Sequence, residues 1–318
     1  MTGNYIEAYK KLSAMDDILL LTHRLPDGDA VGSIFALYLV LKGMGKRVKC
    51  VTDKIPSSLK IAALDDCCED FEEKYVVTVD VGDRKLLGDE LNEKYGDKVD
   101  LCIDHHGTNV EYAKYTLLDP AASAACEVIF DMLTAAGAVI TADIAKELYI
   151  GIATDTGCFR YGNTTAKTMR TAAALMETGI DTTYFNTEIF ETKSREYAAF
   201  ERLALNSLNT FFDGRIAVMV ITRDMYELSG LDEADDKAVN ALPRQIEGVL
   251  AGITVKEKKD GSGWRVSVRS KDPVSAADIC VQLDGGGHRL AAGCELTGTR
   301  EDAVNALLCA AKNVLDKI

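Results

Sequence analysis

The chain has 318 residues, of which 47% are hydrophobic and 27% charged, and this is enough apolar material for two globular domains. Its formal net charge of −14 argues against a surface that binds a long polyanion, because phosphate binding depends on neutralisation by Lys and Arg. A small phosphorylated substrate is compatible with this charge, since bound divalent cations invert the local field.

The cysteines and the apolar runs indicate a cytoplasmic protein. There are nine cysteines but no C-x-x-C pair, which favours reduced, buried thiols over disulfides or structural zinc. The N-terminus lacks the apolar region of a signal peptide, and no apolar run reaches the length of a membrane span. We therefore expect a protein that does not insert into membranes.

Short apolar runs alternate with helical patterns in the first half of the chain. The strands are expected at residues 17–22, 47–52, 75–79 and 99–103, and the helices at 31–42, 124–136 and 141–153. Near-continuous apolar strands separated by helices are typical of a parallel sheet covered on both faces. This pattern predicts an N-terminal α/β domain with a mostly parallel sheet flanked by helices, over residues 1–186.

The second half begins with a charged segment of helical spacing, residues 187–208, which we interpret as a helical connector. Strands are then expected at 214–221, 252–258 and 264–268, with a turn at 259–263, and helices at 274–282 and 300–316. Residues 209–318 are therefore predicted to form a smaller C-terminal α/β domain.

Polar residues with metal-binding side chains follow the first predicted strand. His23, Asp27 and Asp29 lie there, and Gly28 would let the backbone turn so that both carboxylates point at one site. Working groups of open parallel sheets lie beyond the carboxyl ends of the strands. An equally strong alternative is a helix-capping turn with Asp29 as the N-cap.

Two further strand ends repeat this arrangement. Asp80 follows the third strand, and Asp104, His105 and His106 follow the fourth, so three of the four histidines lie at strand ends while His288 lies in a glycine loop. Nitrogen and carboxylate ligands without thiolates suit Mn²⁺ or Mg²⁺. Two such ions, roughly 3.5–4 Å apart, can clamp a phosphate and activate a bridging water. Asp80 is well suited to bridge them, which predicts a two-metal phosphoesterase.

Several motifs carry a resemblance to a known family. They are HRLPDGD (residues 23–29), VDVGD (79–83), DHH (104–106), DPAASAACE (119–127) and GIATDTG (151–157), with Phe159 and NTT (163–165), and in the second domain Arg269, Ser270 and GGGHRLAAG (285–293). In this order, over nearly the whole chain, they resemble the DHH phosphoesterases and their associated DHHA1 domain.

The resemblance implies two divalent metal ions, with Mn²⁺ expected and Mg²⁺ or Co²⁺ as alternatives. It assigns His23, Asp27 and Asp80 to one ion, and Asp29, Asp80, His105 and Asp155 to the other. Asp155 enters through the resemblance alone, since an Asp near a helix end is normally a solvated or capping residue. Of the catalytic residues, Asp104 is expected to orient an imidazole and His106 to face the substrate. Asp83 and Glu127 are interpreted as structural.

The resemblance also implies a substrate-binding loop in the second domain. Its expected members are Arg269, Ser270, Gly285, Gly286, Gly287 and His288. Glycines without Cβ atoms expose backbone N–H groups to an anion, and Arg269 and His288 would grip a terminal phosphate or stack near a base. The alternative is a flexible turn before a helix.

Length and domain content point to one branch of the family. The chain lacks the extra domain of a RecJ-like exonuclease, the lysine-rich element of a family II pyrophosphatase, and membrane segments. It is most similar to the stand-alone oligoribonuclease and pAp phosphatase (nanoRNase) type. That type degrades short oligoribonucleotides and dephosphorylates adenosine 3′,5′-bisphosphate (pAp), and a homodimer is the family expectation. The acidity of the chain argues against binding of long duplex nucleic acid. The alternatives are a phosphodiesterase for cyclic or linear di-adenylate and a non-catalytic nucleotide sensor.

Overall fold

The computed structural model describes residues 4–318 except 63, 65, 66 and 68, and the chain forms two compact units, Met1–Thr192 and Lys193–Ile318. The division falls inside residues 187–208, where a helical connector is expected. Helix α8 (Arg195–Asn206) in this segment packs on β7 (Ile216–Ile221) and α9 (Arg223–Ser229) of the second unit.

A five-stranded parallel sheet forms the centre of the first unit. Its strands are β1 (Ile18–Leu21), β2 (Val48–Val51), β3 (Tyr75–Val79), β4 (Val99–Asp104) and β5 (Tyr115–Leu118), in the order β2-β1-β3-β4-β5. The chain order reverses between β1 and β3, and ligands of such sheets bind at the carboxyl ends of the strands beside this switch point.

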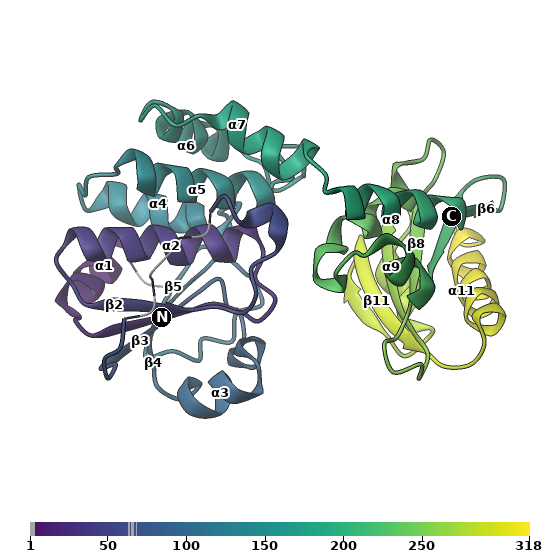
Figure 1. Cartoon of the computed structure of the whole chain (residues 1–318), viewed down its shortest axis with the longest axis horizontal. Coiled ribbons are helices and arrows are strands. Elements are labelled where there is room, and N and C mark those ends of the chain that lie inside the picture. The colour runs from purple at the N-terminus through teal and green to yellow at the C-terminus, as the bar shows by residue number, and fades with distance from the viewer. Residues whose placement is uncertain (1–3, 63, 65–66, 68) are drawn as a thin grey trace. The chain divides into compact units, whose positions relative to one another are not determined.

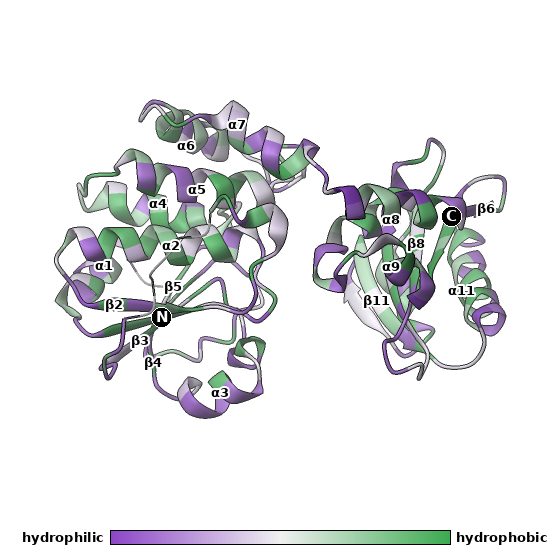
Figure 2. Ribbon diagram, viewed as in Figure 1, coloured by the Kyte–Doolittle hydropathy of each residue, from purple (hydrophilic) through white to green (hydrophobic). Residues whose placement is uncertain are grey.

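Helices cover both faces of this sheet (Figure 1). The helices of this unit are α1 (Tyr5–Ala14), α2 (Gly28–Gly43), α3 (Asp89–Tyr95), α4 (Ala125–Ala135), α5 (Ala142–Asp155), α6 (Ala166–Met176) and α7 (Thr182–Asn186), followed by the π-helical turn Thr187–Glu191. Helices α6 and α7 form an outer layer on α4 and α5, away from the sheet. Helices α1, α2, α4 and α5 share the larger hydrophobic core with one face, while α3 covers the other. Helix α2 packs on both the sheet and α5, which explains why it is apolar on most of its circumference (Figure 2).

The second unit contains a six-stranded mixed sheet. Its remaining strands are β6 (Asn209–Phe211), β8 (Ala251–Glu257), β9 (Trp264–Ser270), β10 (Gly286–His288) and β11 (Ala291–Leu296), in the order β10-β11-β9-β8-β7-β6, with only β7 and β8 parallel. Helices α10 (Ala276–Val281) and α11 (Arg300–Leu315) cover one face. The 3₁₀ segment η5 (Lys237–Gln245), together with α8 and α9, covers the other.

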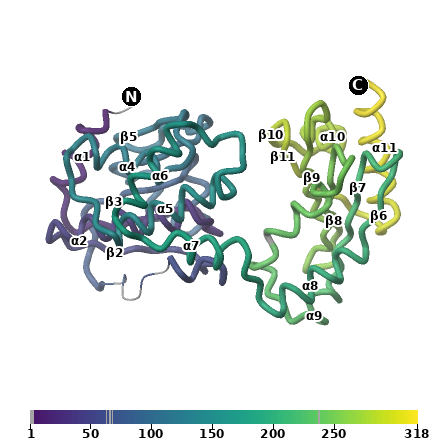
Figure 3. The backbone as a smooth tube through the Cα atoms, turned by 90° about the horizontal axis from the view of Figure 1, so that it is seen from above, coloured from purple at the N-terminus to yellow at the C-terminus, as the bar shows by residue number. Residues whose placement is uncertain are grey.

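The predicted strands and helices are confirmed, with shifts of a few residues at their ends. The elements α1, α3, β5, α6, α7, β6 and α9 were not predicted. The alternative of a flexible turn at the glycine run is wrong, because residues 286–296 form the β10–β11 hairpin beside β9 (Figure 3). Most of the described cysteines are buried, while Cys68 lies outside the described residues.

Candidate metal centre

The candidate metal-binding residues gather at the carboxyl ends of three neighbouring strands. His23 follows β1, Asp80 follows β3, and the Asp104–His106 segment ends β4. These strands lie side by side at the switch point of the sheet. The topology therefore explains why residues far apart in sequence meet at one edge.

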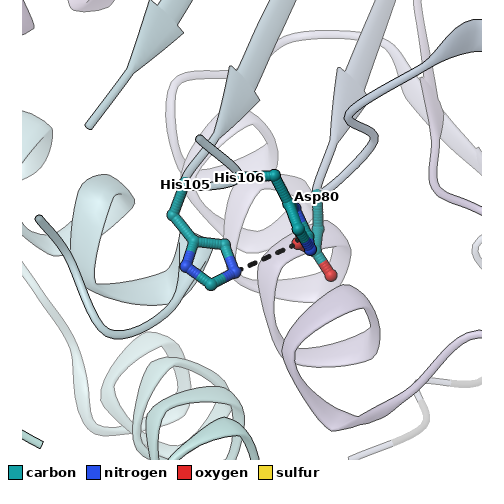
Figure 4. A group of neighbouring side chains, drawn as sticks. All are labelled: Asp80, His105 and His106. Atoms are coloured by element: carbon teal, nitrogen blue, oxygen red, sulfur yellow. Dashed lines mark ion pairs between the residues drawn. The ribbon is translucent and has the colours of Figure 1, made fainter. Parts of the chain in front are cut away.

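Asp80 lies at the centre of this group. It is 3% exposed, and its oxygens face two imidazoles: Oδ2 lies 3.6 Å from His23 Nε2, and Oδ1 lies 3.7 Å from His105 Nε2. Figure 4 shows the approach of His105 to Asp80. Its φ of +57° is in the left-handed region, which costs a non-glycine residue free energy and is common at functional sites. Its Oδ1 has no hydrogen-bond partner among the described residues, so a buried acceptor is left for a cation.

The loop after β1 places Asp27 and Asp29 differently. Helix α2 begins at Gly28, and its N-cap is Asp27, whose Oδ1 accepts from Ala30 N at 3.1 Å. The alternative in which Asp29 is the N-cap is therefore wrong. Asp27 Oδ1 also lies 3.8 Å from His23 Nε2, so one carboxylate caps the helix and faces the site.

Gly28 has a different role from the one expected. It begins a regular helix, and a Cβ at this position would lie 2.5 Å from Cγ2 of Thr154. The glycine thus permits close packing of α2 on α5 rather than a special turn. This packing brings the first turn of α2, with Asp29, next to the last turn of α5, with Asp155.

Asp29 is fully enclosed and is held by the start of α4. Its Oδ2 accepts from Ala125 N at 2.6 Å and its Oδ1 from Cys126 N at 2.9 Å. These amides belong to the first turn of a helix, where they have no partner within the helix and favour an anion. Oδ2 also lies 3.8 Å from His105 Nε2.

Asp104 organises the turn that carries both histidines. Its Oδ1 accepts from the backbone N–H groups of His105 and His106 and lies 2.8 Å from His106 Nδ1, while Oδ2 accepts from Asn109 Nδ2 at 2.6 Å. Burial opposes ionisation of Asp104, but these hydrogen bonds hold its pKa below the usual value. The hydrogen bond between His106 Nδ1 and Asp104 Oδ1 also raises the pKa of His106 to about 9.

Asp155 approaches the site as the last residue of α5. Its Oδ2 lies 4.0 Å from His105 Nε2 and accepts from Asn163 Nδ2 at 3.2 Å. Asn163 also donates to Ser123 O at 3.0 Å. The sequence placed Asn163 and Ser123 in motifs of the family but assigned them no role, because only the fold brings Asn163 between Ser123 and Asp155.

The electrostatics of the site favour a bound cation. Burial, together with repulsion from Asp80 and Asp155, raises the pKa of Asp29 well above its usual value, and burial raises that of Asp155 to about 6. Burial opposes protonation of His23, but the carboxylates of Asp27 and Asp80 raise its pKa to about 10. Crowded carboxylates of this kind are stabilised as anions by a divalent cation.

Among the residues that the structure describes, two groups of side chains have ligand atoms close enough to share an ion. They are His23, Asp27 and Asp80, and Asp80, His105 and His106, each within 4.8 Å. Asp80 belongs to both. Asp29 and Asp155 lie outside the second group, but a carboxylate oxygen of each is within 4.0 Å of His105 Nε2. His106, which was expected to contact substrate, lies inside the second group. These nitrogen and oxygen donors, with the unpartnered Oδ1 of Asp80, fit a divalent cation.

The residues expected to bind substrate lie around the β10–β11 hairpin of the second unit. Arg269 lies on β9 opposite Ala291 of β11, and His288 is exposed on β10. Ser270 points inward, is 1% exposed, and its Oγ accepts from Ala276 N at 3.1 Å. Arg269 and His288 therefore lie on the two strands that flank β11, each opposite Ala291, whereas the Ser270 hydroxyl is hydrogen-bonded at the start of α10.

The glycines of this hairpin have distinct environments. Gly287 has a φ of +141°, and a Cβ there would lie 2.7 Å from Ala291 O. Gly285 packs against the backbone of Cys294, whereas Gly286 has open space around its Cα. Two of the three glycines are thus required by the hairpin itself.

Family comparisons agree with this geometry. The family model described as the DHH family, N-terminal domain matches residues 17–152, and the DHHA1 domain model matches residues 217–317. The chain belongs to the DHH family. His23, Asp27, Asp29, Asp80 and the Asp104–His106 triplet lie within the DHH match, while Asp155 and Asn163 lie just beyond it.

DHH relatives cover most of the chain. A bifunctional oligoribonuclease and PAP phosphatase NrnA of Thermus thermophilus is 32% identical over 88% of this chain and 84% of the relative. The protein of the same name from Bacillus subtilis is 27% identical over 91% and 92%.

Solved DHH structures share the fold. An exopolyphosphatase-related protein from Bacteroides fragilis superposes with a TM-score of 0.87, at 23% identity, over 97% of this chain and 96% of that one. RecJ of Thermus thermophilus in complex with Mn²⁺ gives a TM-score of 0.56, at 13% identity, over 99% and 55%. In the part of this chain that the structure describes, no helix has the length and apolar character of a membrane span.

Proposed function

We propose that this chain is a two-metal phosphoesterase that hydrolyses short oligoribonucleotides and removes the 3′-phosphate of pAp. The observation that carries the proposal is the position of Asp80, whose two carboxylate oxygens face His23 on one side and His105 on the other. The names of the relatives from Thermus thermophilus and Bacillus subtilis support the choice of substrates.

The proposed metal ligands form two sets that share Asp80. One set is His23, Asp27 and Asp80, and the other is Asp29, Asp80, His105 and Asp155. We propose Mn²⁺ for both, with Mg²⁺ or Co²⁺ as alternatives, because the donors are nitrogen and oxygen. When bound, such a pair lowers the pKa of the attacking water and stabilises charge on the phosphate.

His106 is the proposed catalytic residue of the chain itself. Its Nδ1 is fixed by Asp104, so its Nε2 is the atom left for the substrate. The hydrogen bond to Asp104 favours the protonated ring, which can donate to a phosphoryl oxygen. Asp104 acts through His106 by fixing the ring.

The second unit is proposed to select the substrate. Arg269 and the exposed His288 can form charge-assisted hydrogen bonds with a phosphate or stack near a base, and the N–H groups of the glycine hairpin can face an anion. Ser270 is tied to the β10–β11 hairpin, because its N–H donates to Leu290 O. Its Oγ accepts from Ala276 N, which also donates to Arg289 O of the hairpin. The net charge of −14 disfavours long duplex nucleic acid. A cytoplasmic location is proposed because most of the described cysteines are buried and no C-x-x-C pair occurs. A homodimer is also proposed, and light scattering would measure its mass.

A substrate panel tests the proposal. Purified protein with Mn²⁺ is incubated with pAp, pApA, a short RNA, cyclic di-AMP and pyrophosphate, and released products are quantified. We expect turnover of pAp and of the short oligoribonucleotides. Turnover of only pyrophosphate or only cyclic di-AMP would contradict the proposal. Nucleotide binding without hydrolysis would identify a sensor instead.

A further inference from the structure

The segment that leads from β5 into the first turn of α4 contacts two of the proposed metal ligands directly and a third through Asn163. We call residues 122–126 the ligand strip. Ala122 O lies 3.3 Å from His105 Nδ1, and Ser123 O accepts from Asn163, which donates to Asp155 Oδ2. The last two residues of the strip, Ala125 and Cys126, donate their N–H groups to Asp29.

These contacts fall on one of the two proposed metal sites. The second site has four proposed ligands, of which Asp80 is shared with the first site. The other three are Asp29, His105 and Asp155, the residues that the ligand strip contacts directly or through Asn163. The first site is built on its own loop: His23 Nδ1 lies 3.0 Å from Arg24 O, and Asp27 Oδ1 accepts from Ala30 N. The ligand strip is therefore placed to orient one metal site without the other.

Glu127 holds the ligand strip from behind. It is fully buried, and its Oε2 accepts from Ser123 N at 2.7 Å, Ser123 Oγ at 2.6 Å and Thr168 Oγ1 at 3.2 Å. Its Oε1 lies 3.8 Å from Lys167 Nζ and has no hydrogen-bond partner among the described residues. Burial of a carboxylate costs free energy unless the group is hydrogen-bonded, so the three hydrogen bonds to Oε2 are needed to keep Glu127 at this position.

The fixed Ser123 peptide transmits this hold to Asp155. With its N–H and hydroxyl bound to Glu127, Ser123 presents its carbonyl to Asn163, and Asn163 presents its amide to Asp155. Partners that orient metal ligands in this way typically change metal affinity about 10–100-fold when removed.

We propose that Glu127 is a positioning residue for the second metal site, acting through the ligand strip and Asn163 on Asp29, His105 and Asp155. The inference rests on the proposed two-metal function. It differs from a purely structural role for Glu127, because it requires that loss of the carboxylate affects the two metal sites unequally.

Titration of the full chain with Mn²⁺ tests this inference. Calorimetry on the wild type should resolve two sites. Glu127→Ala should weaken one of them about tenfold or more and leave the other within about twofold. Glu127→Gln keeps an acceptor oxygen for Ser123 and should restore binding. Asn163→Ala, a change on an exposed loop, should weaken the same site as Glu127→Ala.

The control is Glu147, a second fully buried glutamate of the same helical layer, which lies on α5. Glu147→Gln should leave both sites unchanged. Because Glu127 and Asn163 act through the same carbonyl, the effects of Glu127→Ala and Asn163→Ala on the second site should be less than additive in the double variant.

The outcomes separate the inference from the function on which it rests. The inference is overturned if Asn163→Ala weakens both metal sites equally or leaves Mn²⁺ binding unchanged. The proposed function is retained in that case if the wild type binds two ions and hydrolyses pAp. A wild type that binds a single Mn²⁺ overturns both.

Discussion

His105 Nε2 lies 3.7 Å from Asp80 Oδ1, so an imidazole from the end of β4 faces a carboxylate from the end of β3. The opposite oxygen of Asp80 faces His23. A carboxylate has acceptor sites on both oxygens, which is what a ligand shared by two cations requires.

Asp80→Asn should abolish hydrolysis while leaving the fold intact. The amide keeps the size of the side chain but has only one acceptor oxygen, so it can bind only one of the two proposed cations. We expect the rate on pAp with Mn²⁺ to fall by about 10²–10³-fold or more. Initial rates and bound Mn²⁺ measured by elemental analysis check this.

The matched control for Asp80→Asn is Asp83→Asn. Asp83 Oδ1 accepts from Lys85 N as the N-cap of a short 3₁₀ segment, a role that Asn also fills. We expect the Asp83 variant to keep its rate and its metal content. A full rate in the Asp80 variant would show that Asp80 is not a shared ligand.

The pH dependence of stability should depend on Glu147. It is fully buried, Lys146 Nζ lies 2.8 Å from its Oε1, and both carboxylate oxygens are without a hydrogen bond among the described residues. Burial raises the pKa of Glu147 to about 8, so the folded state holds this proton more tightly than the unfolded state. The resulting stability is full below the usual value near 4.5 and is lost as the pH rises through about 8.

Glu147→Gln removes this titration. Between about pH 5 and pH 9, the free energy of unfolding of the wild type should fall, relative to that of the variant, by on the order of a few kcal/mol. Urea denaturation of both proteins across this range measures the difference. Parallel curves would show that Glu147 ionises in the folded protein as it does in the unfolded one.

Gly28→Ala should destabilise the protein, because its Cβ would lie 2.5 Å from Cγ2 of Thr154 and would push α2 away from α5. Overpacking of this kind costs about 1–3 kcal/mol. Gly43→Ala, at the other end of α2, is the control: nothing lies within 4 Å, and it should be neutral or stabilise by about 0.4–1 kcal/mol. Thermal unfolding compares the two. If the Gly28 variant were as stable as wild type, the packing of α2 on α5 would tolerate a methyl group.

The strand ends could be predicted from the sequence because the pattern there is local. A continuous apolar run followed at once by Asp or His marks the edge of a parallel sheet, and it identified His23, Asp80 and His105 without knowledge of the fold. Asp155 was different. It ends a helix, where an acidic residue is ordinary, and only the resemblance to the family singled it out.

The supporting contacts could not be predicted, because they depend on tertiary packing. Glu127 at the third position of a helix usually stabilises that helix end, and nothing local shows that it holds Ser123. The function of Gly28 was misjudged for the same reason, since the side chain that excludes a Cβ there is Thr154 of another helix. The β10–β11 hairpin was missed because glycine-rich segments have low strand propensity.

Gly287→Ala should weaken substrate binding without affecting the metal centre. The φ of +141° is strained for alanine, and the added Cβ would meet Ala291 O at 2.7 Å, so the hairpin that carries His288 would shift. A strain of about 1–3 kcal/mol corresponds to a rise in KM of about five- to a hundredfold, provided that it is expressed in binding. Steady-state kinetics on pAp and on a short oligoribonucleotide measure KM and kcat.

Gly286→Ala is the control for this effect, since Gly286 has open space around its Cα and its φ is not in the left-handed region. It should retain the wild-type KM, and both variants should bind Mn²⁺ as the wild type does, because the proposed metal ligands lie in the other unit. An unchanged KM in the Gly287 variant would remove the hairpin from substrate binding. A loss of Mn²⁺ in that variant would instead show that the two units do not act as separate elements for metal and substrate.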